Sequence, residues 1–244
     1  MKVFQTNQTE TVICDDECGD KNAVTASNHQ KLNDIQDLLK AHNVTNKSEC
    51  EPPKVRFAGI SEILPSLYLC GAGVAIPIFF EKLRITCVIN AAPELPDTPL
   101  SLIDNTKPLY LQIPVLDKSD INISVYFDEV ADLIEHIRQT NGKTMVHCVA
   151  GVSRSATLCL AYLMKHMKMT LKDAFELVRS VRPQIRPNTG FIRQLIAYEE
   201  KLYQNVSVKM IFKESLGQEI PDIYEPEYQA LELFYQKHRH LKLR

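Results

Sequence analysis

The chain of 244 residues is predicted to fold as one α/β domain with an extension at each end. Between about residues 60 and 203, short apolar segments alternate with longer segments of helical periodicity, which is typical of a layered α/β fold. The length accommodates one full hydrophobic core plus tails, but hardly two domains of ordinary size. Residues 1–54 are polar and end in Glu51-Pro52-Pro53, so we expect a mostly disordered extension before the domain.

Four segments have the length and composition of β-strands. Loops rich in Pro and Asp separate the first three, and the fourth follows a turn at Asn141-Gly142. One helix is expected between the first strand and the second. The predicted strands cover residues 67–70, 85–90, 109–114 and 143–146.

A helix is predicted from about Ser124 to Gln139, because apolar residues recur on one face and Ser124 or Asn122 can cap the first turn. The apolar stripe consists of Val125, Val130, Leu133, Ile134 and Ile137. Three more helices are predicted at about 154–167, 170–181 and 188–203, with Pro183 and Pro187 separating the last two.

The segment from His147 to Ser155 joins the fourth predicted strand to a predicted helix. A loop at such a junction presents unpaired backbone N–H groups and the positive end of the helix dipole, which favours a bound anion. Gly151 lets the backbone curl inward, and Arg154 can grip two phosphate oxygens with its planar guanidinium. The positive electrostatic field of the helix dipole and of Arg154 also favours the nucleophilic thiolate form of Cys148. The predicted phosphate-binding residues are Val149, Ala150, Gly151, Val152, Ser153 and Arg154.

The letters HCxxGxxRS in this segment resemble the signature of the cysteine-dependent protein tyrosine phosphatases, most closely the small atypical dual-specificity phosphatases. The resemblance covers about residues 60–203. It implies a central mixed β-sheet flanked by α-helices, most of them on one side, and a catalytic domain over residues 55–204. It also implies hydrolysis of phosphotyrosine, phosphoserine and phosphothreonine through a cysteinyl phosphate, with no metal or cofactor.

Attack on a phosphomonoester needs an acid that protonates the departing oxygen. Asp117 follows the third predicted strand, 31 residues before Cys148, where the family keeps its general-acid loop. The alternatives are Asp120 as the acid, and a turn or capping role for Asp117. For Ser155, the resemblance implies a hydrogen bond to the departing sulfur, whereas its position equally suits a helix cap.

Two further residues are predicted to support the site. His147 precedes the nucleophile and suits a structural hydrogen bond better than a general base, since the loop already favours the thiolate. Asn188 either packs against the phosphate loop, as the resemblance implies, or caps the following helix. Cys87 and Cys159 lie in apolar segments and are expected to be core residues.

The uncharged loop residues favour a phosphoprotein substrate over an inositol lipid, whose phosphatases tend to place lysines there. No aromatic segment like the one that deepens the pocket of tyrosine-specific enzymes is found, which favours a shallower pocket. Two alternatives stay open: a phosphatase acting on lipid or RNA phosphates, and a pseudophosphatase that only binds phosphoproteins. The presence of Cys148, Arg154 and Asp117 weighs against the second.

A net charge of −2 and a pI near 6.4 give no general attraction to nucleic acid or to an anionic membrane. No apolar run reaches the length of a membrane span, and the start lacks a secretory apolar region. With seven cysteines too unevenly placed for a disulfide scaffold, an intracellular protein of the cytoplasm or nucleus is expected.

Residues 205–244 are predicted to form an extension with an amphipathic helix that ends in basic residues. Its apolar and aromatic side chains recur at helical spacing. Residues 237–244 resemble the basic and Leu-X-Leu docking peptides of mitogen-activated protein kinases, although a solvated basic helix end explains them too. The residues at helical spacing are Tyr228, Leu231, Phe234, Tyr235 and His238.

Overall fold

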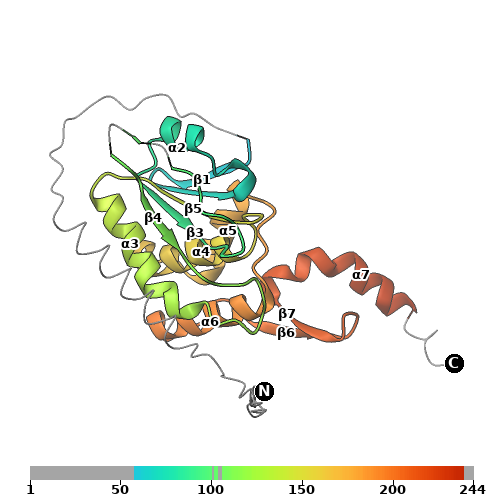
Figure 1. Ribbon diagram of the computed structural model, residues 1–244. Coiled ribbons are helices and arrows are strands. Elements are labelled where there is room, and N and C mark those ends of the chain that lie inside the picture. The colour runs from blue at the N-terminus through green and yellow to red at the C-terminus, as the bar shows by residue number, and fades with distance from the viewer. Residues whose placement is uncertain (1–57, 101, 104–105, 239–244) are drawn as a thin grey trace, which may run out of the picture.

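The computed structural model describes residues 58–100, 102–103 and 106–238. The predicted extension over residues 1–54 and the end of the basic segment, residues 239–244, lie outside the described residues. A five-stranded sheet in the order β1-β2-β5-β3-β4 forms the centre of the fold (Figure 1). The strands are β1 (Ile60–Leu64), β2 (Leu67–Gly71), β3 (Cys87–Asn90), β4 (Leu109–Gln112) and β5 (Thr144–Cys148).

The sheet is mixed, as predicted. β1 pairs antiparallel with β2, and all other neighbours are parallel. All five residues of β5 are buried, because this strand has a neighbour on each side and helices above and below. In the register of the sheet, Cys148 lies opposite Gly71 of β2 and His147 lies opposite Asn90 of β3. The segments that follow the carboxyl ends of these parallel strands therefore meet at one edge of the sheet.

Helices cover both faces of the sheet, with most of them on one side, as predicted (Figure 1). On one face, α2 buries Phe80 and Leu83 in a small cluster with residues of β2, β3 and β5. The other helices pack with the larger core on the opposite face. The helices are α2 (Pro77–Leu83), α3 (Phe127–Gln139), α4 (Arg154–Met167), α5 (Leu171–Val181) and α6 (Thr189–Tyr203).

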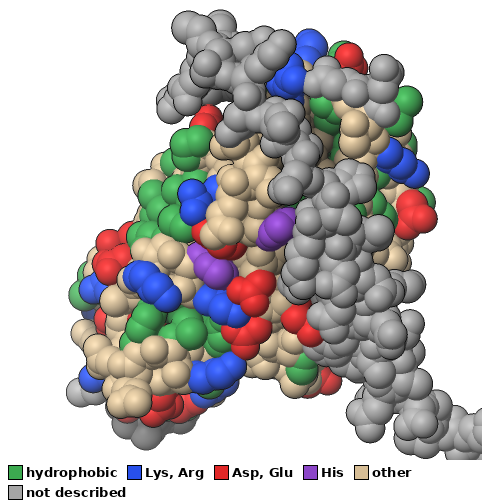
Figure 2. Space-filling view, turned by 90° about the vertical axis from the view of Figure 1, so that its left-hand side faces the viewer, with side chains coloured by type: hydrophobic (Ala, Val, Ile, Leu, Met, Phe, Trp, Pro, Cys, Tyr) green, Lys and Arg blue, Asp and Glu red, His purple; other side chains and the backbone are tan. Residues whose placement is uncertain are grey.

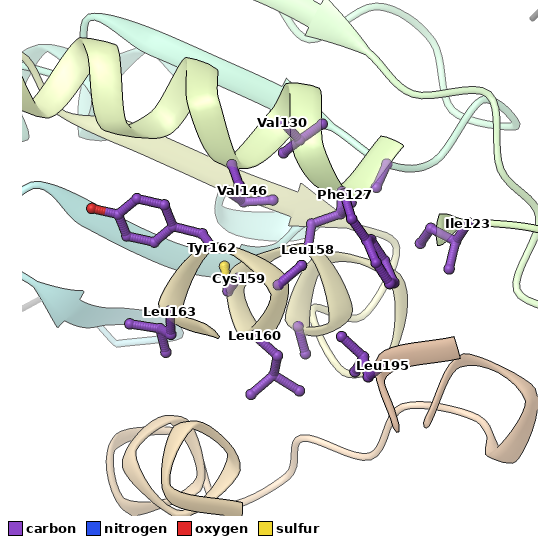
Figure 3. Close-up of a cluster of buried hydrophobic side chains, with 14 of the residues drawn as sticks. Ile123, Phe127, Val130, Val146, Leu158, Cys159, Leu160, Tyr162, Leu163 and Leu195 are labelled. Carbon is purple, nitrogen blue, oxygen red and sulfur yellow. The ribbon is translucent and has the colours of Figure 1, made fainter. Parts of the chain in front are cut away.

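Helix α4 is the centre of the larger core. Its first eleven residues, Arg154 to Met164, are all buried, because the sheet, α3, α5 and α6 surround it. Figure 3 shows Leu158 of α4 beside Phe127 of α3. This packing fixes the start of α4, and hence Arg154, relative to the end of β5.

The start of α3 differs in detail from the prediction. A 3₁₀ turn, Ser124–Tyr126, precedes the helix. The N-cap residues are Ile123 for this turn and Tyr126 for α3, so the prediction of Ser124 or Asn122 as the cap is wrong. Asn122 Oδ1 does accept a hydrogen bond from the Ser124 N–H at 3.2 Å just before the turn. Gln194 of α6 accepts further bonds from the N–H groups of Ile123 and Ser124, each at 2.9 Å. A side chain distant in sequence thus satisfies donors that local residues leave open.

Acidic and basic side chains are interspersed on the face shown in Figure 2, together with histidines. Ion pairs link α3 to α4 and α6 on the surface: Lys165 contacts Asp128 at 2.8 Å and Asp132 at 2.9 Å, and Lys201 contacts Asp128 at 2.9 Å. These exposed pairs add little stability individually. No helix in the described part of the chain has the length and apolar character that a membrane crossing requires.

The C-terminal arm, residues 205–238, consists of the hairpin β6 (Met210–Lys213) and β7 (Gln218–Pro221) followed by α7 (Glu225–His238). The hairpin and the edge strand β1 are absent from the predicted elements. The helix is present as predicted, but its apolar residues do not form a buried face: Leu231 is 43% exposed and Phe234 is 62% exposed. The beginning of α7 contacts the domain, and the rest extends away from it (Figure 1).

Candidate active site

The loop between Cys148 and Arg154 is held in shape by contacts on its outer side. Four successive carbonyl groups point away from the centre of the loop and accept hydrogen bonds. Because the carbonyl and N–H of a peptide point in opposite directions, the N–H groups that follow are turned toward Cys148. The outward bonds run to Val149 O from Ala72 N (3.0 Å), to Ala150 O from Arg182 Nη2 (3.0 Å), to Gly151 O from Arg182 Nε (2.7 Å), and to Val152 O from Arg186 N (2.9 Å).

Arg182, at the end of α5, is a functional residue that the sequence analysis missed. Its side chain is buried, and its Nη1 also donates to Gly59 O at 3.0 Å. Burial lowers its pKa from the usual value for arginine. An arginine at the end of a helix and before a proline is usually exposed, so the local sequence does not indicate that Arg182 binds the distant loop between Cys148 and Arg154.

Gly151 has the positive φ of 66° that the curl of the loop requires. A Cβ at this position would lie 2.3 Å from the carbonyl oxygen of Cys70 and 2.7 Å from Arg182 Nη2. A glycine is therefore required here for a second reason, because the loop passes too close to β2 and to the Arg182 side chain to leave room for a Cβ.

Arg154 forms a bidentate pair with Glu94, which the sequence analysis did not single out. Nη1 donates to Glu94 Oε2 at 2.8 Å, and Nη2 lies 2.6 Å from Oε1. Arg154 lowers the pKa of the Glu94 carboxyl. Burial opposes the charge of Arg154, but its pair with Glu94 still raises its pKa. Its Nε is buried and has no hydrogen-bond partner among the described residues, so a donor is left for an anion in the pocket.

Asp117 and the alternative acid Asp120 are both exposed, but only Asp117 is among the residues that line the pocket. The Oδ1 atom of Asp117 accepts hydrogen bonds from Ser153 Oγ and from Asn188 Nδ2, both at 2.8 Å. Its Oδ2 lies 3.9 Å from Arg154 Nε. Two hydrogen bonds to one oxygen thus fix the orientation of the carboxyl and leave the other oxygen beside the guanidinium.

Asn188 performs both of the roles that the sequence left open. Its Oδ1 caps α6 by accepting from the Phe191 N–H at 2.9 Å, while its Nδ2 contacts Asp117. Its backbone N–H donates to Ser153 Oγ at 3.1 Å. The residue therefore connects the phosphate loop, the carboxylate of Asp117 and the start of α6.

Ser155 and His147 lie on either side of Cys148 and have different contacts. Ser155 Oγ lies 3.1 Å from Cys148 Sγ, and both side chains are buried. His147 Nε2 lies 3.0 Å from Thr98 Oγ1, which is the structural hydrogen bond expected for this residue. Burial lowers the pKa of His147 to about 4, so its imidazole is neutral at pH 7.

The buried imidazole gives the fold a defined acid sensitivity. The unfolded chain protonates His147 below about pH 6.5, whereas the folded chain does so only below about pH 4. Between these values the unfolded state binds more protons, so lowering the pH from 7 to 4 should reduce the free energy of unfolding by about 3 kcal/mol through this residue alone.

Urea unfolding of the native chain and of His147→Gln at pH 7, 5.5 and 4 measures this linkage. Carboxyl groups contribute equally to both proteins, so the difference isolates His147. We expect a shallower decline in the variant, and parallel curves would contradict the assignment.

The four described cysteines are all buried as free thiols. Cys159 lies in α4 and Cys87 in β3, as expected for core residues. Burial raises the pKa of Cys87 to about 12 and also raises that of Cys159, so both remain protonated. Their role in the described structure is packing.

The pocket above Cys148 has a volume of about 510 Å³. Its wall includes Tyr224 of the C-terminal arm, although no sequence pattern indicates an aromatic side chain at the pocket. That side chain comes from a segment 76 residues beyond Cys148, so only the tertiary structure brings it there. The other lining residues are Asp117, Val149, Ala150, Val152, Ser153, Arg154, Arg186, Pro187, Asn188 and Thr189.

A cysteine at the centre of an anion-binding loop, on a mixed sheet of this topology, defines a cysteine-dependent phosphatase as the class of protein. The family model described as the dual specificity phosphatase catalytic domain matches residues 67–201. The chain belongs to the dual specificity phosphatase family, and the family supports protein phosphatase activity.

Curated relatives and solved structures agree with this assignment. Mouse dual specificity protein phosphatase 14 is 45% identical over 176 residues, covering 72% of this chain and 85% of the relative. Human dual specificity protein phosphatase 21 is 44% identical over 172 residues, covering 70% of this chain and 87% of the relative. The structure of a human tyrosine phosphatase-like serine/threonine/tyrosine-interacting protein is 31% identical with a TM-score of 0.54, covering 60% of this chain and 98% of that one. A mouse putative dual specificity phosphatase has the same TM-score at 29% identity, covering 66% and 96%.

Proposed function

We propose that Cys148 is the nucleophile of this phosphatase and that Arg154 and the N–H groups of the loop bind the transferred phosphoryl group. The thiolate attacks phosphorus, an S–P bond forms, and the P–O bond to the leaving group breaks. The observation that supports this most directly is the set of four outward carbonyl bonds of the loop, which implies that the N–H groups that follow point inward, beside the unpartnered Nε of Arg154. Such preorganised donors stabilise the charge of the transition state.

Asp117 is the general acid and base of the proposal. In the first step it gives its proton to the departing oxygen, and in the second the carboxylate takes a proton from the water that attacks phosphorus. The S–P bond then breaks, inorganic phosphate leaves, and Ser155 donates a hydrogen bond to the sulfur as it regains its negative charge. The position of Asp117 Oδ2 next to Arg154 Nε supports this assignment over Asp120.

Replacing Asp117 by Asn should affect substrates according to their leaving group. An alkoxide from phosphothreonine needs protonation, so kcat for a phosphothreonine peptide should fall roughly 10²- to 10⁴-fold. p-Nitrophenolate leaves without such help, so p-nitrophenyl phosphate should lose much less. Asp120→Asn is the matched control and should change neither rate by more than about twofold. An equal loss on both substrates would remove Asp117 from the acid role.

The substrate is proposed to be a phosphoprotein. The uncharged side chains of Val149, Ala150, Val152 and Ser153 support this choice, because the loop has no cation besides Arg154 to contact the extra phosphates of an inositol lipid. Turnover of phosphotyrosine and phosphothreonine peptides, compared with inositol phosphates and a 5′-phosphorylated RNA, separates these classes. Preferred hydrolysis of a non-protein phosphate would reverse the proposal.

Mitogen-activated protein kinases are proposed as partners through residues 237–244, and an intracellular location in cytoplasm or nucleus is proposed with them. The basic and Leu-X-Leu pattern supports the partner, and residues 239–244 lie outside the described structure. Deletion of residues 237–244 should weaken binding to a purified kinase at least about tenfold. Turnover of p-nitrophenyl phosphate by the same variant serves as the control, and unchanged kinase affinity would exclude the docking role.

A further inference from the structure

The C-terminal arm reaches the active-site pocket through Tyr224. This side chain is 1% exposed and lines the pocket with Cys148. Its hydroxyl donates to Pro187 O at 2.7 Å, and its ring packs on that of Phe175 with centroids 5.7 Å apart. The family model ends at residue 201, so this wall lies beyond the matched segment. The arm is therefore a structural part of the pocket.

Arg186 is held at the pocket from two sides. Its backbone N–H donates to Val152 O at 2.9 Å, which ties it to the phosphate loop. Its guanidinium lies over the ring of Tyr224 at 4.6 Å and over that of Tyr228 at 5.4 Å. It also donates to the carboxylate of Glu227 and to the hydroxyl of Tyr228. Three residues of the arm thus fix the position of one cation relative to Cys148.

The charge of Arg186 is only partly compensated. The carboxylate of Glu227 is shared with Arg179, whose Nη2 lies 2.9 Å from Oε1. The single negative charge of Glu227 is therefore paired with two positive charges, those of Arg179 and Arg186. The contacts with the arm engage two of the five N–H groups of the Arg186 guanidinium, and the side chain is 39% exposed. Donors and net positive charge remain available to a ligand at the pocket.

The other charged lining residues act on the phosphate itself. Arg154 and Asp117 are engaged with Glu94, Ser153 and Asn188 in the catalytic group. Among the described lining residues, Arg186 is the charged side chain left to contact substrate residues beside the phosphorylated one. A carboxylate is the side chain that meets a guanidinium with two parallel hydrogen bonds.

We propose that Arg186 binds an acidic side chain adjacent to the phosphorylated residue of the substrate, and that the C-terminal arm sets this preference by holding the guanidinium in place. The inference rests on the phosphoprotein activity proposed above and deepens it. Tyr224 and Tyr228 are positioning residues, Glu227 competes with the substrate carboxylate for the guanidinium, and Arg186 is the residue in contact with substrate.

Phosphotyrosine peptides that differ only by Glu or Gln at one position test the proposal. The exchange is made in turn at the two positions before and the two positions after phosphotyrosine. At one position or more, kcat/KM for the Glu peptide should exceed that for the Gln peptide by about three- to tenfold. The difference should come from a lower KM for the Glu peptide, and it should become smaller at high salt. In Arg186→Met this ratio of kcat/KM should fall to one. Arg138→Met, at the end of α3, is the matched control and should keep the native ratio.

Glu227→Gln separates specificity from stability. It removes the competing carboxylate while the tyrosine rings still hold the guanidinium, so the ratio should rise. A purely structural arm would instead lower Tm and leave the ratio unchanged. A native ratio of one at every position, with the peptides hydrolysed, would overturn the inference alone, as would a ratio that survives Arg186→Met. Failure to hydrolyse any peptide would overturn the phosphoprotein activity itself.

Discussion

Cys148→Ser should abolish turnover of p-nitrophenyl phosphate and of phosphopeptides in the presence of a chelator, with kcat reduced roughly 10⁴-fold or more. The serine hydroxyl occupies nearly the same place as the thiol, but it is a far weaker nucleophile than the sulfur of the proposed mechanism. The covalent step is lost while the N–H groups of the loop remain. Steady-state rates, together with rapid quenching of a ³²P-labelled substrate, measure both consequences.

The labelled phosphoryl group should remain attached to the native chain after quenching and be absent from the variant. Phosphopeptide binding by Cys148→Ser should persist, which separates a chemical defect from a folding defect. Cys87→Ser is the matched control, because this thiol is buried in β3 away from the pocket. Turnover that survives Cys148→Ser would exclude the thiolate mechanism. A well-folded native chain that binds phosphopeptides without hydrolysing them would identify the pseudophosphatase alternative.

Arg154→Lys should lower kcat/KM about 10³-fold although the charge is kept. The native guanidinium contacts Glu94 with two of its nitrogens and still presents Nε to the pocket. The single ammonium group of lysine cannot contact Glu94 and the phosphate at the same time, so the phosphate loses a fixed hydrogen-bond donor in the transition state. The loss should appear in kcat as well as KM, because the interaction strengthens as charge develops on the phosphoryl oxygens.

Two variants define the origin of this effect. Arg138→Lys alters an exposed arginine of α3 and should retain native kinetics. Glu94→Gln keeps the shape of the partner but weakens its hold, and should reduce kcat/KM about tenfold by misaligning the guanidinium. If kcat/KM of Arg154→Lys stayed within about tenfold of the native value, charge alone would suffice and the geometric argument would be wrong.

The sequence was most informative where chemistry and local structure coincide. The predicted helix over 154–167 is α4, Arg154–Met167, because a long apolar segment follows a loop with a defined motif. Cys148, Arg154, Ser155 and Asp117 lie at or after the carboxyl ends of the parallel strands β5 and β4, which converge at the pocket, and Asn188 joins them from the start of α6. Short strands with weak patterns were harder: the edge strand β1 is only partly buried and shows no clear alternation.

The supporting residues escaped prediction for a physical reason. Arg182 and Glu94 act through contacts with residues 31 and 60 positions away, and neither has a neighbouring motif that marks it. Tyr224 likewise reaches the pocket only because the β6–β7 hairpin returns the chain to residue 187. Sequence patterns report on local periodicity and on characteristic chemical arrangements of neighbours, whereas these contacts depend on how distant elements pack.

Arg182 should be a position outside the pocket at which substitutions alter the rate, because its side chain makes two of the four outward carbonyl bonds of the phosphate loop. The loop takes its shape from Ala72, Arg182 and Arg186, and the N–H groups are aligned before substrate arrives. Little reorganisation is then left for the binding step. Arg182 is not among the residues that line the pocket, so a search for rate-altering variants confined to the pocket would overlook it.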